Sequence, residues 1–85
     1  MDRFEYTIKD QNGLHARPAG LLVRKMQTVE GEWTIEKGER SANLKKLLAL
    51  MGLGIRCGDR ITVRAEGNYR PEDVLEIKRF FEENF

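Results

Sequence analysis

The chain has 85 residues, enough for one domain and too few for a two-domain enzyme with a cleft between its domains. Hydrophobic residues make up 40% of it and charged residues 34%, a mixture that excludes both a disordered chain and a membrane protein. The formal net charge of +1 predicts neither a nucleic-acid binder nor a polyanion-like protein. No apolar run approaches the roughly 18 residues of a membrane span, and residues 1–4 lack the basic start of a signal peptide, so we expect a single cytoplasmic domain over residues 1–85.

The chain has one cysteine, Cys57, and one histidine, His15. A single cysteine cannot form an internal disulfide, and these two side chains are too few soft ligands for a structural zinc site. We therefore expect no metal and no cofactor, and a fold that is held together by packing alone.

The first half of the chain predicts a strand, a helix and a hairpin. Apolar and polar residues alternate over 4–8, the period of a strand with one face on a core. Residues 10–13, Asp-Gln-Asn-Gly, are typical of a turn. Alternation over 32–36, a Lys-Gly-Glu turn and residues 40–42 predict a β-hairpin. A helix over about 16–28 is predicted by an apolar stripe at helical spacing, formed by Ala19, Leu22, Val23 and Met26.

The second half predicts two helices with a strand between them. Asn43 is a good N-cap for a short helix over 44–51, which Gly52 and Gly54 end. Alternation over 60–66 predicts a strand, and Pro71 begins a last helix whose inner stripe is Val74, Ile77 and Phe81. The order β-α-β-β-α-β-α indicates an α+β open-faced β-sandwich, a four-stranded, mostly antiparallel sheet with three helices on one face.

Residues 12–19, Asn-Gly-Leu-His-Ala-Arg-Pro-Ala, stand at the start of the first predicted helix. Proline is tolerated in a first helical turn because its missing N–H would be unpaired there, so Pro18 places His15 at or next to the N-cap. The free N–H groups of that turn and the positive end of the helix dipole form an anion site, to which Arg17 adds a guanidinium suited to phosphate oxygens. This arrangement suggests a phosphohistidine, and the alternative is a helix-capping or surface histidine.

The same eight residues resemble the active-site signature of the HPr phosphocarriers of the phosphoenolpyruvate-dependent sugar phosphotransferase system (PTS). Residues 43–55 resemble that family's second helix and its Leu-Gly-Ile exit, and the likeness in length and element order covers essentially the whole chain. The resemblance implies that enzyme I passes a phosphoryl group to Nδ1 of His15, which hands it to a IIA domain of a sugar permease. It also implies that Arg17 and the backbone amides near Ala16 and Arg17 stabilise that group, in a carrier that turns over no small molecule by itself. We expect a monomer.

Apolar residues over 44–55 are too numerous for one buried side of a short helix. A core position is the default for an amphipathic helix, but Leu44, Leu50, Leu53 and Ile55 could fill the core and leave other residues of the segment exposed. The resemblance implies that the exposed set lies beside His15 and docks enzyme I and IIA domains. This predicted docking set consists of Leu47, Leu48 and Met51, joined by Gly20 and Leu21 from the first helix.

Lys46 departs from the pattern of many Gram-positive members of the family. The resemblance places it where those proteins carry a serine that a dedicated kinase phosphorylates. Lys46 has no hydroxyl group and has the opposite charge, and Ser41 lies elsewhere, on a predicted strand. We therefore expect no regulatory serine in this chain.

The basic residues are unevenly distributed along the chain. Residues 15–29 and 40–64 together hold nine basic residues and one acidic residue, whereas the other segments hold six basic and thirteen acidic residues. We predict that positive charge gathers around the phosphoryl site and the second helix, and that phosphotransfer slows as salt increases.

Two other functions stay open at this point. Small α+β domains can bind RNA on their sheet, but this usually needs aromatic residues in mid-sheet with basic residues around them. Tyr6 and Trp33 are the only candidates, and the other faces of their strands carry glutamates, so we expect no nucleic-acid partner and no membrane insertion. A nearer alternative is a regulatory or nitrogen-related phosphotransfer paralogue, which would keep the chemistry of His15 and serve different partners.

Overall fold

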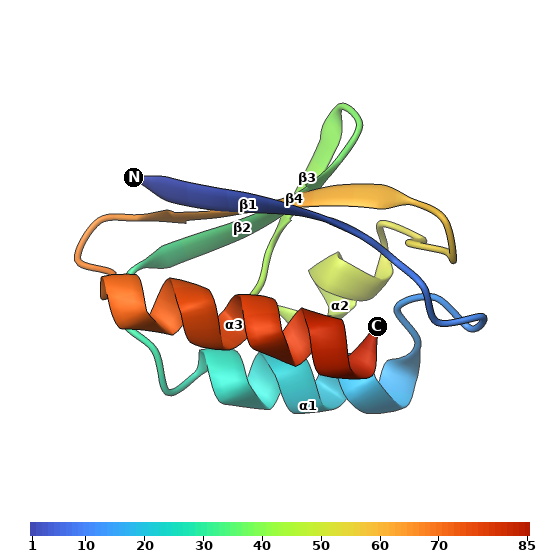
Figure 1. Ribbon diagram of the computed structural model, residues 1–85, viewed down its shortest axis with the longest axis horizontal. Helices are drawn as coiled ribbons and strands as arrows, with labels where there is room; N and C mark the ends of the chain where they lie inside the picture. The colour runs from blue at the N-terminus through green and yellow to red at the C-terminus, as the bar shows by residue number, and fades with distance from the viewer.

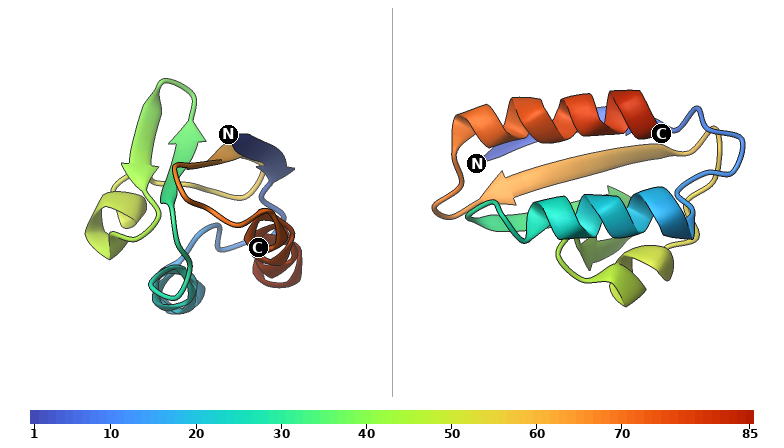
Figure 2. Two further views of the ribbon diagram at one scale, coloured as in Figure 1. Left: turned by 90° about the vertical axis from the view of Figure 1, so that its left-hand side faces the viewer. Right: turned by 90° about the horizontal axis from the view of Figure 1, so that it is seen from below.

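Four strands and three helices follow one another in the predicted order in a computed structural model, which describes residues 1–85. The strands form one sheet in the order β1-β4-β2-β3, and every neighbouring pair is antiparallel. The helices lie on one face of this sheet (Figure 1), and α2 sits beside the β3 edge (Figure 2). The predicted open-faced α+β sandwich is therefore confirmed. The elements are β1 (Asp2–Thr7), α1 (Ala16–Met26), β2 (Glu32–Lys37), β3 (Arg40–Asn43), α2 (Leu47–Met51), β4 (Arg60–Glu66) and α3 (Pro71–Asn84).

The two faces of the sheet follow from the alternation of apolar and polar residues along the strands. The inward positions of the three longer strands are buried against the helices, and they include Trp33, Ile35, Ile61 and Val63. The outward positions form rows of polar residues across all four strands. One such row is Glu5, Thr62, Glu36 and Ser41.

Tyr6 and Trp33 both belong to the inner side of the sheet. Trp33 is fully buried and its indole N–H donates a hydrogen bond to the carbonyl oxygen of Glu30 (2.8 Å). Tyr6 packs edge-on against Phe81 of α3, with 6.0 Å between the ring centroids. The outer face thus has no aromatic side chain on which a base could stack, and the RNA-binding hypothesis loses the residues on which it depended.

The core lies between the sheet and the helices. The two longer helices contribute apolar stripes at the predicted spacing, since Leu22 and Met26 of α1 and Ile77 and Phe81 of α3 are fully buried. Burying a side chain of this size contributes about 1.5–3 kcal/mol, so twenty buried hydrophobic residues stabilise a chain that has no disulfide. None of the three helices has the length and apolar sequence that a membrane-spanning helix needs.

The predicted start of α2 is wrong by three residues. Asn43 is the last residue of β3, and its Oδ1 accepts the N–H of Lys45 (2.8 Å), so its side chain closes a turn before the helix. Leu44 is fully buried outside any helix, and Lys46 is the N-cap of α2. The first helix is also shorter than predicted, because it ends at Met26.

The exit of α2 is held by two cations from the β2–β3 hairpin. Nη2 of Arg40 donates to the carbonyl oxygen of Gly52 (2.8 Å), and Nζ of Lys37 donates to that of Gly54 (3.0 Å). Carbonyl groups at the end of a helix lack intrahelical partners and attract positive side chains. A five-residue helix is unstable alone, so these contacts and the buried Leu50 hold α2 in place.

Candidate functional site

The start of α1 has the geometry of an anion site. His15 is the N-cap residue with extended backbone angles (φ −94°, ψ 169°), as the position of Pro18 predicts. The first intrahelical hydrogen bond runs from the N–H of Ala19 to the carbonyl oxygen of His15 (3.0 Å), so the N–H groups of Ala16 and Arg17 have no helical acceptor. The first turn contains no acidic residue, so no side chain of the helix itself compensates the positive end of the helix dipole.

A carboxylate faces the imidazole of His15 from the preceding turn. Oδ2 of Asp10 lies 3.6 Å from Nε2 of His15, and each side chain is about one third exposed (32% and 38%). The sequence predicted Asp10 only as part of a turn and gave it no functional role. The available signal was the Asx turn, in which Asp10 Oδ1 accepts the N–H of Asn12 (2.8 Å) and so keeps the carboxylate close to the loop.

The loop before His15 rests on the segment that follows α2. Gly13 has a left-handed backbone (φ +64°), and a Cβ atom added there would lie 2.5 Å from the carbonyl oxygen of Ile55. The N–H of Leu14 donates to the same oxygen (3.1 Å), and the Leu14 side chain is buried. The glycine thus permits a close backbone approach that places His15 beside the exit of α2.

The end of α3 holds the other side of this loop. The main-chain oxygen of Phe85 accepts hydrogen bonds from the N–H groups of Lys9 (2.6 Å) and Asp10 (2.8 Å). The Phe85 ring is buried against Phe81, with 5.4 Å between the ring centroids. The C-terminal residue therefore lies against the loop that precedes the histidine, as Figure 1 shows for the C-terminus.

The predicted docking residues divide by exposure. Leu48 is 87% exposed, Leu21 50% and Leu47 39%, whereas Gly20 and Met51 are half-buried. We call these five residues the α1–α2 surface, because α1 and α2 pack against each other. The prediction that Leu44, Leu50, Leu53 and Ile55 fill the core in their place is confirmed, since all four are buried.

The predicted gathering of positive charge is correct only in part. Arg60 pairs with Glu5 (3.2 Å) and Arg64 with Glu36 (3.1 Å), and both pairs lie on the outer face of the sheet, away from the helices. The prediction failed for these two because alternate residues of a strand point to opposite faces. The exposed cations of the two basic segments that form no ion pair and no hydrogen bond from their side chains are Arg17, Arg24, Lys46 and Arg56.

No hydroxyl group stands at the N-terminus of α2. Lys46 is exposed at the N-cap and makes no side-chain capping hydrogen bond, and Lys45 and Leu47 flank it. Ser41 is on the outer face of the sheet, paired across the strands with Glu36. The only serine of the chain therefore lies on the face of the sheet that the helices do not cover.

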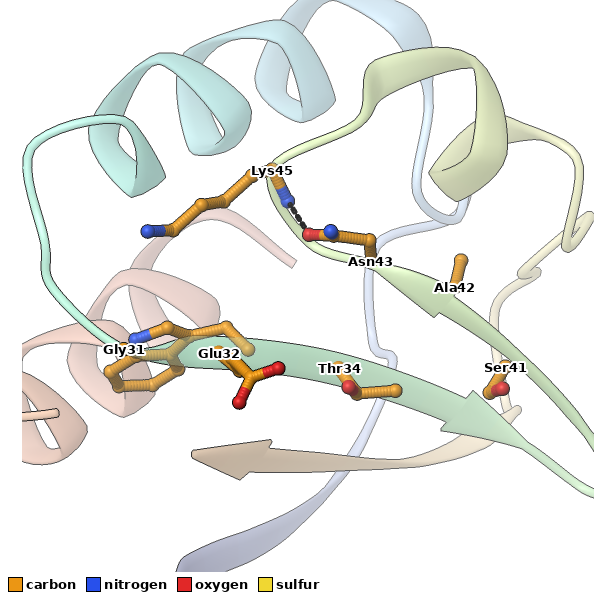
Figure 3. Close-up of a pocket in the computed structure, with 8 residues that line it drawn as sticks. Gly31, Glu32, Thr34, Ser41, Ala42, Asn43 and Lys45 are labelled. Carbon is orange, nitrogen blue, oxygen red and sulfur yellow. Dashed lines mark hydrogen bonds between the residues drawn. The ribbon is translucent and has the colours of Figure 1, made fainter. Parts of the chain in front are cut away.

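The largest hollow of the molecule lies elsewhere. It has a volume of about 400 Å³ and lies between β2, β3 and Lys45 (Figure 3). Two of its polar residues are already engaged, since Asn43 Oδ1 accepts the N–H of Lys45, whose Nζ donates to the carbonyl oxygen of Val29 (2.8 Å). His15 and Arg17 line neither this hollow nor the smaller one beside α3, so the histidine does not lie in a cavity.

A lone, partly exposed histidine thus stands at the N-terminus of a helix on an open-faced sandwich. The family described as "PTS HPr component phosphorylation site" matches residues 3–83. The chain belongs to this HPr family.

Known relatives of the chain are phosphocarriers. The phosphocarrier protein HPr of Mycoplasma genitalium is 36% identical over 85 residues, which cover 99% of this chain and 97% of the relative. A multiphosphoryl transfer protein of Xanthomonas campestris is 40% identical over 70 residues, 82% of this chain but only 8% of that protein. Domains of this family thus occur both alone and inside a much longer chain.

Solved structures agree in fold. The HPr of Bacillus anthracis is 31% identical with a TM-score of 0.83, covering 94% of this chain and 95% of that one. An HPr of Thermoanaerobacter tengcongensis, 30% identical with a TM-score of 0.70 and covering 98% of this chain and 94% of its own, is described as a dimer. The monomeric state of the present chain therefore stays a prediction.

Proposed function

We propose that this chain is a single-domain, cytoplasmic phosphocarrier that receives a phosphoryl group from enzyme I on Nδ1 of His15 and passes it to IIA domains of sugar permeases. The observation that carries this proposal is the position of His15 at the N-cap of α1, in front of the free amides of Ala16 and Arg17. Membership of the HPr family supports the same role.

The chemistry is one displacement that is later reversed on a second partner. The lone pair of Nδ1 attacks the phosphorus atom, and the bond between phosphorus and the atom of enzyme I that carried it breaks. The amides of Ala16 and Arg17, the helix dipole and the guanidinium of Arg17 stabilise the negative oxygens in transit. No carboxylate in the first turn opposes this charge.

The partners dock on the α1–α2 surface beside the histidine. Leu21, Leu47 and Leu48 offer exposed apolar area, and Arg17 and Lys46 offer charge for acidic partner surfaces. We propose that the carrier acts as a monomer and has no serine-kinase switch, since Lys46 stands at the N-cap of α2.

The direct test incubates the protein with phosphoenolpyruvate and enzyme I. An acid-labile phosphoryl adduct, with the ³¹P resonance of a phosphorus bonded to Nδ1, is the expected product. His15→Ala should abolish it and still fold, because the His15 side chain makes no capping hydrogen bond. The chain has no other histidine, so no second imidazole can accept the group. A protein that folds but takes up no phosphoryl group would contradict the proposal.

A further inference from the structure

We propose that Asp10 is a positioning residue for His15, holding the imidazole in the tautomer that has its proton on Nε2 and its lone pair on Nδ1. The consequence for phosphotransfer rests on the function proposed above. The tautomer itself does not, and it can be measured on the unphosphorylated protein.

Hydrogen bonds hold both the side chain and the main chain of Asp10. Its side-chain Oδ1 accepts the N–H of Asn12 (2.8 Å). Its main-chain oxygen accepts the N–H of Gly13 (2.9 Å), and its main-chain N–H donates to the main-chain oxygen of Phe85 (2.8 Å). With Oδ1 engaged in the Asx turn, Oδ2 is the oxygen that faces His15. The loop therefore presents one carboxylate oxygen to the ring at a set position.

The contact selects one ring nitrogen. Asp10 supplies the only carboxylate within 4.0 Å of the imidazole, and its Oδ2 lies nearest Nε2, at 3.6 Å. An ionised carboxylate only accepts hydrogen bonds, so the nitrogen that faces it carries the proton, and the other nitrogen of a neutral imidazole has a free lone pair. The distance is longer than a hydrogen bond, and contacts of this kind commonly tighten when the partner binds.

This arrangement serves the transfer step without moving a proton. When Nδ1 bonds to phosphorus and the donor's bond breaks, Nε2 keeps its proton throughout and the ring gains a positive charge. Asp10 then faces a positive ring on one side, while the helix amides face the negative phosphoryl oxygens on the other. Between the two neutral tautomers, the carboxylate thus favours the one with a free Nδ1 lone pair, and it also favours the phosphorylated ring.

Asp10→Asn is the sharpest test. An asparagine Oδ1 can still accept the N–H of Asn12, so the Asx turn is kept, but the atom facing Nε2 becomes an amide nitrogen that only donates. We expect the ring ¹⁵N shifts, measured at a pH where the imidazole is neutral, to move from the Nε2–H tautomer toward the Nδ1–H tautomer. Phosphorylation by enzyme I should slow about three- to tenfold, the effect of losing one partly exposed, charge-assisted contact.

Two further variants separate positioning from a general loss of charge. Asp2→Asn removes a carboxylate at the far end of the molecule, where Asp2 accepts the hydroxyl of Tyr69 (2.8 Å), and should leave the tautomer and the rate unchanged. Asp10→Ser keeps an acceptor for the N–H of Asn12 and places no group on Nε2, so it should give a mixture of tautomers.

The outcomes distinguish this inference from the proposed function. A folded Asp10→Asn protein with the wild-type tautomer would overturn the inference, whatever its rate. A tautomer shift without any slowing would overturn the role of Asp10 in transfer. If the wild-type protein accepts no phosphoryl group but Asp10→Asn still shifts the tautomer, the proposed function fails and the positioning of His15 by Asp10 stands.

Discussion

Gly13 is the residue on which the position of His15 depends most directly. In Gly13→Ala, an alanine would have to adopt the positive φ of Gly13. Its Cβ would lie 2.5 Å from the carbonyl oxygen of Ile55 and 2.8 Å from Cα of Arg56. Backbone atoms cannot rotate out of the way as a side chain can, so the loop must lift off the segment after α2. We expect a loss of about 2–4 kcal/mol in the free energy of unfolding, measured with urea, and slower phosphorylation of His15.

Gly38→Ala is the matched control for this change. Gly38 has nearly the same backbone angle (φ +60°), but nothing lies within 4 Å of a Cβ added there. The free energy of unfolding of Gly38→Ala should fall by only about 1 kcal/mol, the cost of a positive φ at alanine, and its phosphorylation rate should be unchanged. Equal losses in the two variants would show that the close approach at Ile55 is unimportant.

The residues of the site were predictable to different degrees. His15 and Arg17 could be placed at a helix start because Pro18 marks that start, as the structure shows. Asp10 could not, because its orientation toward His15 depends on a loop that Ile55 and Phe85 hold from distant parts of the chain. Local patterns therefore predicted where the histidine lies and left its neighbour unassigned.

Among the elements, α2 carries the clearest test of the docking proposal. Leu48 is 87% exposed, so Leu48→Asp removes little buried area and should change the melting temperature by at most a few degrees. If partners dock there, a charge in an apolar contact should slow phosphotransfer from enzyme I at least about tenfold. The two measurements are the thermal midpoint and the rate with enzyme I in limiting amount.

Leu75→Asp provides the comparison on another helix. Leu75 is 67% exposed on α3, so the substitution introduces the same charge at a similarly solvated apolar site outside the α1–α2 surface. It should leave the rate of transfer unchanged. Equal slowing by both variants would argue against a docking role that is specific to α2.

The boundaries of the elements were less predictable than their order. Long stripes such as that of α3 identify a helix because many residues share one period. At α2 the helical spacing of apolar residues predicted a helix that starts before the observed one. The reason is that Leu44 is buried in the core from a turn, which the side chain of Asn43 closes. The excess of apolar residues after Asn43 was still informative, since it correctly indicated that some of them are exposed.

At the scale of the whole molecule, the distribution of free charge predicts a salt effect. Arg17 and Arg24 stand two turns apart on the exposed side of α1, and neither forms an ion pair. Because the Debye length falls from about 30 Å at 0.01 M to 10 Å at 0.1 M salt, encounter with an acidic partner should slow several-fold over that range. Stopped-flow transfer rates across the salt series measure this effect.

Two single substitutions would locate this charge on the surface. Arg24→Gln should weaken the salt dependence, whereas Arg60→Gln should not, because Arg60 is paired with Glu5 on the outer face of the sheet. A transfer rate that does not respond to salt would contradict electrostatic attraction of the partner by the cations of α1. Equal salt responses of the two variants would contradict it as well.

The fold class was predictable from the order of elements, but the arrangement of the strands was not. The sheet order β1-β4-β2-β3 brings the first strand against the last, a pairing that local periodicity does not encode. The pairing of β4 with β1 turns Arg60 toward Glu5, and its pairing with β2 turns Arg64 toward Glu36, which is why a count of charges by segment placed both arginines on the wrong side.

The two ends of the chain leave the fold at opposite sides of the molecule (Figure 1). Asp2 is held by Tyr69 at one end, and the main-chain oxygen of Phe85 lies against Lys9 and Asp10, next to His15, at the other. A partner domain fused after residue 85 by a short linker would therefore be tethered at the loop that carries His15, with a high effective concentration there. The same domain fused before residue 1 would have to span the length of the sheet to reach the histidine.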